Sequence, residues 1–218
     1  NAALRATGGI CFAIDQLMAG HGRNALCVTR PPGHHADSAL AMGFCLFNNV
    51  AVGARHAQAE HGIERVASLD FDVHHGNGTQ AIFERDPSVM FDSSHQVPLY
   101  PGTGFPDETG RGNIINLPLR PATGSDEFRD AWSKIALPAV KAFQPGLILV
   151  SAGFDAHNQD PLGQLELTEE DYRWITRAIV EVADDCCHGR VVSILEGGYH
   201  LEALGRSARA HVEELVTP

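Results

Sequence analysis

Three short segments of the chain combine histidine and aspartate at spacings that suit metal-assisted hydrolysis. They are residues 30–36 (RPPGHHA), 70–78 (DFDVHHGNG) and 153–157 (GFDAH). An imidazole ring is costly to bury unless both of its nitrogens find partners, so two adjacent histidine pairs beside glycines are hard to explain as packing. The segments therefore predict a hydrolytic metal site.

Asp72, His74 and Asp155 are the candidate metal ligands. In an extended segment, residues two apart project to the same face, so Asp72 and His74 can bind one cation together. Asp155 follows an apolar run, where burying a carboxylate is costly unless it has a partner. Binding a metal ion would provide that partner, so Asp155 is the best candidate for the third ligand. Three protein ligands leave one position for water, as in catalytic zinc sites. The alternative for Asp72 and His74 is a strand-end cap and a hydrogen-bonded histidine.

His34 and His35 are candidates for acid and base chemistry, because either could accept a proton from a metal-bound water or donate one to a leaving amine. Each needs a partner on its second nitrogen, and Asp70 and Asn77 are available. A carboxylate on one histidine and a neutral amide on the other would separate their basicities. Which of the two histidines is the base stays open.

Tyr199 follows two glycines that permit close approach of the backbone. Its phenol could hydrogen-bond an oxyanion opposite the metal. Packing is the alternative for a tyrosine near a strand end, and the other motifs favour catalysis.

Short β-rich runs alternate with helical patterns, which is typical of a parallel sheet covered by helices. The predicted strands are residues 24–29, 65–71, 89–93, 113–117, 147–151 and 191–195. The predicted helices are residues 2–19, 48–61, 126–143, 168–188 and 201–215. The candidate residues follow the predicted strands, and in open α/β sheets ligands bind beyond the carboxyl ends of the strands. The sequence thus predicts one α/β domain with its site on one rim.

Composition excludes several function classes. Acidic residues outnumber basic ones 27 to 16, which argues against nucleic acid as a direct partner and fits a cationic ligand, although such a charge also simply keeps a protein in solution. No apolar run approaches the ~20 residues of a membrane span, and no signal sequence opens the chain, so we expect a soluble, cytoplasmic protein without a membrane partner. The five cysteines show no CxxC spacing and are expected to be reduced.

Seven motifs occur in the order typical of one family: RPPGHHA, GFC, FNN, DFDVHHGNGTQ, YPGTG, GFDAHNQDPLG and LEGGYHL. In these motifs the chain resembles the histone deacetylase family, zinc amidohydrolases that include acetylpolyamine amidohydrolases. Asn77, and Glu196 before the paired glycines, resemble class II and the bacterial enzymes of that class. The resemblance implies a three-layer αβα, arginase/deacetylase-like fold with a mainly parallel sheet.

The resemblance also implies roles for particular residues. Asp72, His74 and Asp155 correspond to the ligands of one catalytic Zn2+, and Tyr199 to the tyrosine that polarises the acetyl carbonyl. His34 and His35 correspond to the catalytic pair, supported by Asp70 and Asn77. The walls of the substrate tunnel would be Gly43, Phe44, Tyr100 and Gly198. A structural monovalent cation, K+ or Na+, would bind at Asp70, Asp72, His74, Ser93 and Ser94, and a second at Phe83, Asp86, Val89 and Asn113.

The expected function is zinc-dependent removal of acetyl or other acyl groups from N-acylated amines, with acetyl-lysine in proteins, acetylpolyamines and small metabolites as candidate substrates. One rival is a two-metal ureohydrolase of the arginase type, but position 76 is glycine where that site needs a carboxylate. The other is a non-catalytic acyl-amine binding protein. Family members carry a further N-terminal region, so we expect residues 1–218 to be a single catalytic domain that is incomplete at its N-terminus. The oligomeric state stays open.

Overall fold

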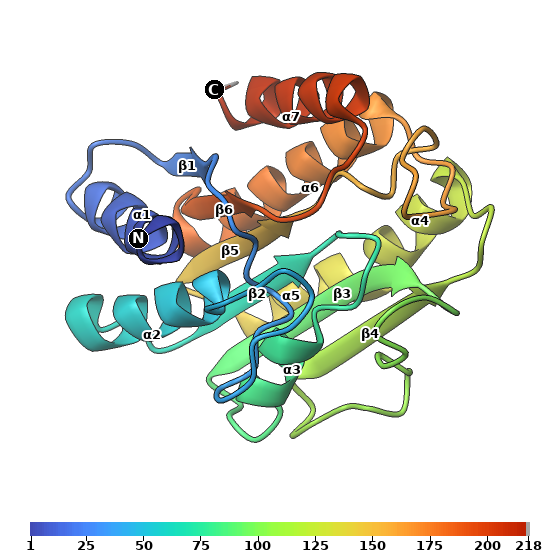
Figure 1. The fold of residues 1–218 in the computed structure, drawn as a ribbon. Helices are drawn as coiled ribbons and strands as arrows, with labels where there is room; N and C mark the ends of the chain where they lie inside the picture. Colours follow the sequence, from blue (N-terminus) through green and yellow to red (C-terminus); the bar gives the residue numbers. More distant parts are fainter. Residues whose placement is uncertain (217–218) are drawn as a thin grey trace.

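A sheet of six parallel strands forms the centre of the protein (Figure 1). The structure, a computed structural model, describes residues 1–216. The strand order is β1-β6-β5-β2-β3-β4, with every neighbouring pair parallel. The strands are β1 (Asn24–Cys27), β2 (Val66–Asp70), β3 (Val89–Gln96), β4 (Ile114–Leu119), β5 (Leu147–Ala152) and β6 (Val191–Leu195).

Helices cover both faces of this sheet. One face carries α1 (Ala2–Met18), α2 (Asn49–His61) and α3 (Asn77–Phe83). The other carries α4 (Ser125–Ala131), the π-helical turn η1 (Trp132–Ala136), α5 (Leu137–Phe143), α6 (Glu169–Cys187) and α7 (Leu201–Leu215). Each face has its own apolar core. The molecule is therefore the three-layer αβα arrangement that the sequence predicts.

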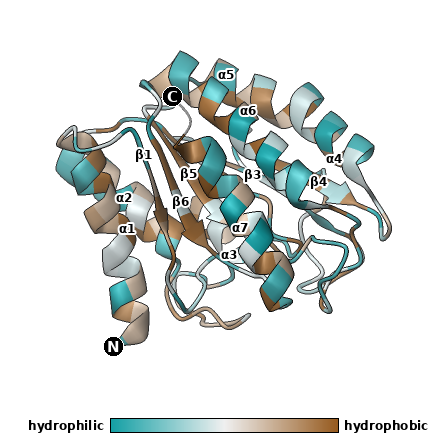
Figure 2. Cartoon of the chain, turned by 90° about the horizontal axis from the view of Figure 1, so that it is seen from above, coloured by the Kyte–Doolittle hydropathy of each residue, from teal (hydrophilic) through white to brown (hydrophobic). Residues whose placement is uncertain are grey.

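Helices cover both faces of the sheet, so strands made of continuous apolar runs can be buried there. Figure 2, which looks at the molecule from above, shows these hydrophobic strands between the helices. All residues of β2, β3 and β5 are buried. The helices present one apolar side to the sheet, and their ends are marked by caps. Asn48 accepts a hydrogen bond from the amide of Ala51 at the start of α2, and Thr168 and Asp171 form a reciprocal capping box at the start of α6.

The predicted elements agree with the observed ones to within a few residues, with two differences. The predicted helix 126–143 is divided into α4, η1 and α5, since Pro138 at the start of α5 cannot donate the backbone hydrogen bond of an uninterrupted helix. Helix α3 was not predicted, because its seven residues are too short for a periodic pattern. None of the helices in the described part of the chain is both long and apolar enough to cross a membrane.

Candidate metal and acid–base site

The candidate residues lie on loops that follow β1, β2, β5 and β6. These strands are neighbours or near neighbours in the sheet and run in the same direction, so their carboxyl ends meet at one rim. Contacts between these loops join segments that are far apart in the chain. The amides of Gly33 and His34, after β1, donate to Oε2 of Glu196, which is 163 and 162 residues away after β6, at 2.6 and 3.2 Å. The order of the strands in the sheet therefore brings these four loops, and the candidate residues on them, together.

Asp72, His74 and Asp155 present their ligand atoms to one point. Nδ1 of His74 lies 3.1 Å from Oδ1 of Asp72 and 3.1 Å from Oδ2 of Asp155. One ligand atom from each residue lies within 4.8 Å of the other two, and both carboxylates are buried. These are the distances that a single small cation needs.

The remaining carboxylate oxygens are held by backbone amides. Oδ2 of Asp72 accepts from the amide of Gly197 at 2.8 Å, and Oδ1 of Asp155 accepts from the amide of Val73 at 2.9 Å. Each carboxylate thus has one oxygen directed at the ring of His74, and in Asp72 this oxygen also accepts from the amide of His74 at 2.9 Å. Two carboxylates and an imidazole form a donor set that suits zinc, so the residues present fit the metal that the resemblance implies.

Electrostatics at this point favour a cation. Burial alone would lower the pKa of His74, but its hydrogen bonds to Asp155 and Asp72 outweigh burial and raise the pKa to about 10. Burial raises the pKa of Asp155, with the charge of Asp72 as a further cause. The raised pKa means that His74 holds a proton between the two carboxylates. A metal ion bound by the three residues would take the place of this proton.

His34 and His35 lie beside this cluster, with ring centroids 4.1 Å apart. Nδ1 of His34 lies 2.9 Å from Oδ2 of Asp70, and Nδ1 of His35 lies 2.7 Å from Oδ1 of Asn77. One histidine therefore has a carboxylate partner and the other a neutral amide. Nε2 of His34 lies 3.9 Å from Oδ1 of Asp72, which places this ring next to the candidate ligands.

The two histidines differ in basicity. Burial opposes the charge on His34, but the carboxylates of Asp70, Asp72 and Glu196 outweigh burial and raise its pKa well above the usual value. Burial and, to a lesser extent, the charge of the neighbouring His34 together lower the pKa of His35 to about 3. Glu196 is thus part of the site through its charge as well as through its two hydrogen bonds.

A cavity of about 440 Å³ opens onto these groups. It is lined by Pro32, His34, His35, Gly43, Phe44, His74, Leu99, Tyr100, Leu162, Gly197 and Tyr199. The ring of Tyr100 meets His35 edge to face at 5.1 Å, and Phe44 and Tyr199 have ring centroids 6.3 Å apart. Gly43 has a positive φ of 55°, and a Cβ there would lie 2.1 Å from Cδ2 of His35, so the close approach of this loop requires glycine.

The chain is similar in sequence and in fold to proteins of one family. A model of the histone deacetylase domain matches residues 1–215. The chain is 42% identical over 217 residues to a histone deacetylase-like amidohydrolase of Pseudomonas aeruginosa, which covers 97% of this chain and 57% of that protein. It is 44% identical over 204 residues to a probable deacetylase of Archaeoglobus fulgidus, covering 92% of this chain and 56% of the other.

The chain belongs to the histone deacetylase family. The crystal structure of the HDA15 HD domain superposes with a TM-score of 0.93 at 41% identity, covering 98% of this chain and 61% of that one. The chain spans about half the length of several curated relatives, including histone deacetylase 14 of Arabidopsis thaliana, of which it covers 50%. The family assignment and the fold agree with the sequence-based expectation.

Three of the four residues expected to form the tunnel of this deacetylase-family chain line the cavity: Gly43, Phe44 and Tyr100. Gly198 lines a smaller adjoining hollow together with Phe44 and Tyr199. The sequence did not indicate Leu99, Leu162 or Pro32, because an apolar residue in a loop carries no signal of its own. Asp160 was also missed, although it anchors the loop of Tyr199 by accepting hydrogen bonds from the amides of Tyr199 and His200 at 2.7 and 3.2 Å.

Of the first expected monovalent-cation site, Asp70 ends β2, whereas Ser93 and Ser94 lie within β3. Asp70 is in register with Ser93. The hydroxyl of Ser93 lies 3.0 Å from Nδ1 of His95, and the hydroxyl of Ser94 accepts a hydrogen bond from Nε1 of Trp132 at 3.0 Å.

The four residues of the second expected cation site are joined by hydrogen bonds from one side chain. The side-chain amide of Asn113 donates to the carbonyl oxygens of Phe83, Asp86 and Val89 at 2.9, 3.1 and 2.7 Å. These three carbonyl oxygens therefore converge on the nitrogen of the protein's own amide. K+ or Na+ at either site stays a prediction.

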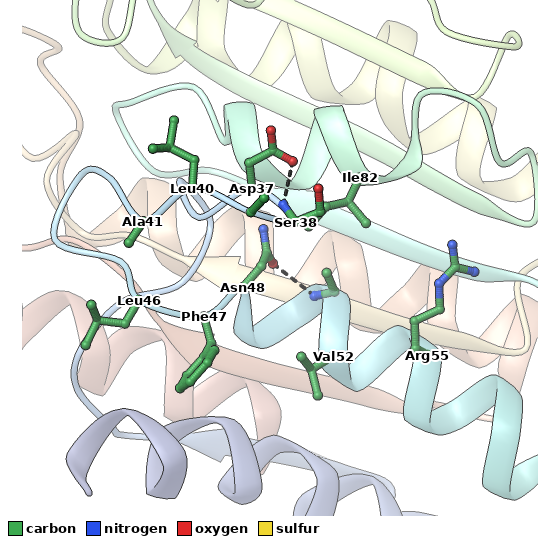
Figure 3. Close-up of a pocket in the computed structure, with 12 residues that line it drawn as sticks. Asp37, Ser38, Leu40, Ala41, Leu46, Phe47, Asn48, Val52, Arg55 and Ile82 are labelled. Carbon is green, nitrogen blue, oxygen red and sulfur yellow. Dashed lines mark hydrogen bonds between the residues drawn. The ribbon is translucent and has the colours of Figure 1, made fainter.

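A further cavity of about 550 Å³ lies beside α2, between the 37–47 loop and Ile82 (Figure 3). Its two charged lining residues are Asp37, which accepts from the amide of Ser38, and Arg55, which pairs with Asp86 at 2.6 Å. The lining contains no histidine, so this larger cavity lacks the chemistry of the rim.

Proposed function

We propose that this histone deacetylase-family chain is a zinc-dependent hydrolase that removes acetyl groups from linear N-acetylated amines. The observation that carries the proposal is the convergence of Asp72, His74 and Asp155 on one point at the base of a cavity that also contains His34 and His35. The family matches support hydrolysis of this type.

The zinc ion would be held by Asp72, His74 and Asp155, where it would act as a Lewis acid on the acetyl carbonyl and lower the pKa of a water molecule. The histidine pair would move protons from this water to the leaving amine. Asp70 stabilises a positive charge on His34, whereas Asn77 holds His35 through a neutral contact. These contacts favour His34 as the histidine that carries positive charge.

Tyr199 would donate a hydrogen bond from its phenol to the oxyanion that forms on the substrate carbonyl. Burial raises the pKa of Tyr199, with the charges of Asp155 and Asp72 as further causes, so the phenol keeps its proton for donation. The amide of Tyr199 is fixed by Asp160, which holds the loop in place at the mouth of the cavity.

The cavity suits an extended aliphatic amine. Phe44, Leu99 and Tyr100 provide apolar walls, and its lining contains no lysine or arginine that would repel a cationic substrate. The net charge of −11 favours positively charged substrates in general. Acetyl-lysine in proteins and acetylpolyamines both meet these criteria, and we propose them as the two substrate classes to compare.

The test measures acetate release from acetyl-lysine peptides and from acetylpolyamines side by side. We expect hydrolysis of at least one class, loss of activity when a chelator removes the metal, and recovery when zinc is restored. Binding of the acetylated amines without acetate release would support the rival binding protein. Release of urea from a guanidino substrate would support the ureohydrolase and overturn the proposal.

A further inference from the structure

A second cluster of metal-binding side chains lies between α1 and α2. Asp15 belongs to α1, and His56 and His61 belong to α2. His61 is the last residue of α2, whereas the opposite end of the same helix is capped by Asn48, which also donates to the carbonyl of Ala36 in the loop of the histidine pair. The cluster is therefore at the end of α2 that is remote from the catalytic rim.

The three side chains converge on a single oxygen. Nε2 of His56 lies 2.6 Å and Nε2 of His61 lies 2.7 Å from Oδ1 of Asp15. The two imidazole rings meet edge to face with centroids 5.6 Å apart. One ligand atom of each residue lies within 4.8 Å of the other two, as it does for Asp72, His74 and Asp155 at the rim.

Close packing of the two helices fixes this arrangement. A Cβ at Gly53 of α2 would lie 2.9 Å from Cδ1 of Ile10 and 3.3 Å from Cδ1 of Ile14, so the helices approach through a glycine. Both isoleucines are fully buried. At the other end of the contact, the hydroxyl of Thr7 donates to Oδ1 of Asn49 at 2.8 Å. The backbones that carry the three ligands are thereby held in place before any ion binds.

The charge at the cluster suits a cation. Among residues 1–216, Asp15 forms ion pairs with His56 and His61 and with no lysine or arginine. Hydrogen bonds from the two histidines lower the pKa of Asp15. The side chains of both histidines are 22% exposed and that of Asp15 is 46% exposed, so an ion can enter and water can complete its coordination.

We propose that Asp15, His56 and His61 bind a second divalent transition-metal ion, which joins α1 to α2. Two imidazole nitrogens and one carboxylate oxygen suit zinc, cobalt, nickel or copper rather than magnesium or calcium. Tetrahedral zinc with ligands at about 2.0 Å separates its ligand atoms by about 3.3 Å, so each histidine nitrogen, now 2.6 or 2.7 Å from Asp15, moves away by about 0.6–0.7 Å. The proposal is independent of the function proposed for the rim.

Counting zinc ions in defined variants tests the proposal. Metal-free protein is titrated with zinc against a chromophoric chelator, and the bound zinc is measured by mass spectrometry. We expect two ions per chain in the parent protein. The double variant His56→Gln and His61→Gln, whose amides keep hydrogen bonds to Asp15, is expected to bind one ion and to retain the parent's acetate release. Asp155→Asn is expected to lose the other ion.

The control is His21→Gln, which removes an exposed histidine that contacts Gln16 close to the end of α1. This control should still bind two ions. Asp15→Asn serves as a second test should the double variant fold poorly, because it keeps the size of the side chain and removes the anionic ligand. An equal number of bound ions in the parent and in the double variant would overturn the proposal and show that the cluster is a hydrogen-bonded contact only.

Discussion

Replacing Gly197 by alanine gives a sharp test of the candidate metal site. Gly197 follows β6, and its amide donates to Oδ2 of Asp72 at 2.8 Å. A Cβ at this position would lie 2.1 Å from Oδ2 of Asp155 and 2.7 Å from Oδ2 of Asp72. The backbone conformation of Gly197 is open to alanine, since no positive φ is found there. The nearest atoms that an alanine side chain would meet are therefore those of the two carboxylates.

The size of the effect follows from these distances. Oδ2 of Asp155 is the oxygen that faces His74, and it must retreat from 2.1 Å to the 3.4 Å of an ordinary contact, a shift of more than 1 Å. Metal–ligand distances tolerate only about 0.2 Å. We expect the zinc affinity of the rim to fall by about 100-fold or more, and kcat/KM to fall by about 100-fold even when zinc is in excess.

Gly205→Ala is the matched control. Gly205 lies in α7 and is exposed, and a Cβ there would meet no atom within 4 Å. Alanine in the interior of a helix should raise the free energy of unfolding by about 0.5–1 kcal/mol and leave zinc binding unchanged. Zinc titration, acetate release and urea denaturation of both variants provide the measurements. Parent-like zinc affinity in Gly197→Ala would refute the placement of Asp72 and Asp155 around one ion.

Three further predictions concern single side chains. Tyr199→Phe should lower kcat by about 100-fold or more with little change in KM in steady-state assays, and unchanged kcat would remove its role at the oxyanion. Burial lowers the pKa of His211 to about 4, so it stays neutral in the folded state while the unfolded chain takes up a proton near pH 6.5. The stability of the parent should therefore fall by up to about 1.4 kcal/mol per pH unit from this group between pH 6.5 and 4, and His211→Gln should flatten that fall in urea denaturation. Neither carboxylate oxygen of the fully buried Asp92 has a hydrogen-bond partner among the described residues, and burial raises the pKa of this carboxyl group. Asp92→Val should therefore increase the free energy of unfolding at pH 7 by about 1–3 kcal/mol in urea denaturation. A decrease would contradict this reasoning.

The sequence predicted best those features that depend on a single strand or a single loop. Continuous apolar runs mark the buried strands, and the polar residues after them mark the rim, because the carboxyl ends of parallel strands share one edge. Asp72 and His74 do converge, but residues 72–74 form bends after β2 rather than the extended backbone that the sequence argument assumed, and the amide of His74 donates to Oδ1 of Asp72 at 2.9 Å. The contacts of His34 with Asp70 and of His35 with Asn77 match the partners that the chain offers nearby.

Contacts between distant segments could not be read in the same way. Glu196 is visible as a residue after β6, but its bonds to the amides of Gly33 and His34 depend on the pairing of β1 with β6. The cluster of Asp15 with His56 and His61 depends on how α1 crosses α2, and a helical pattern does not specify that crossing. The location in the cell and the bound monovalent cations stay predictions.

Buried carboxylates explain why metal binding and the stability of the rim should be linked. Asp70, Asp72, Asp155 and Glu196 are all at most 5% exposed, and no lysine or arginine lines the cavity beside them. Backbone amides donate to at least one oxygen of each, but an amide dipole does not cancel a full negative charge. In the absence of metal, this charge is balanced by protons on the neighbouring histidines and on the carboxyl groups themselves, because burial raises the pKa of Asp70, Asp155 and Glu196. A zinc ion bound there as proposed would replace the proton on His74 and would require the folded arrangement of the three ligands, so we expect it to stabilise the fold in proportion to the logarithm of its concentration.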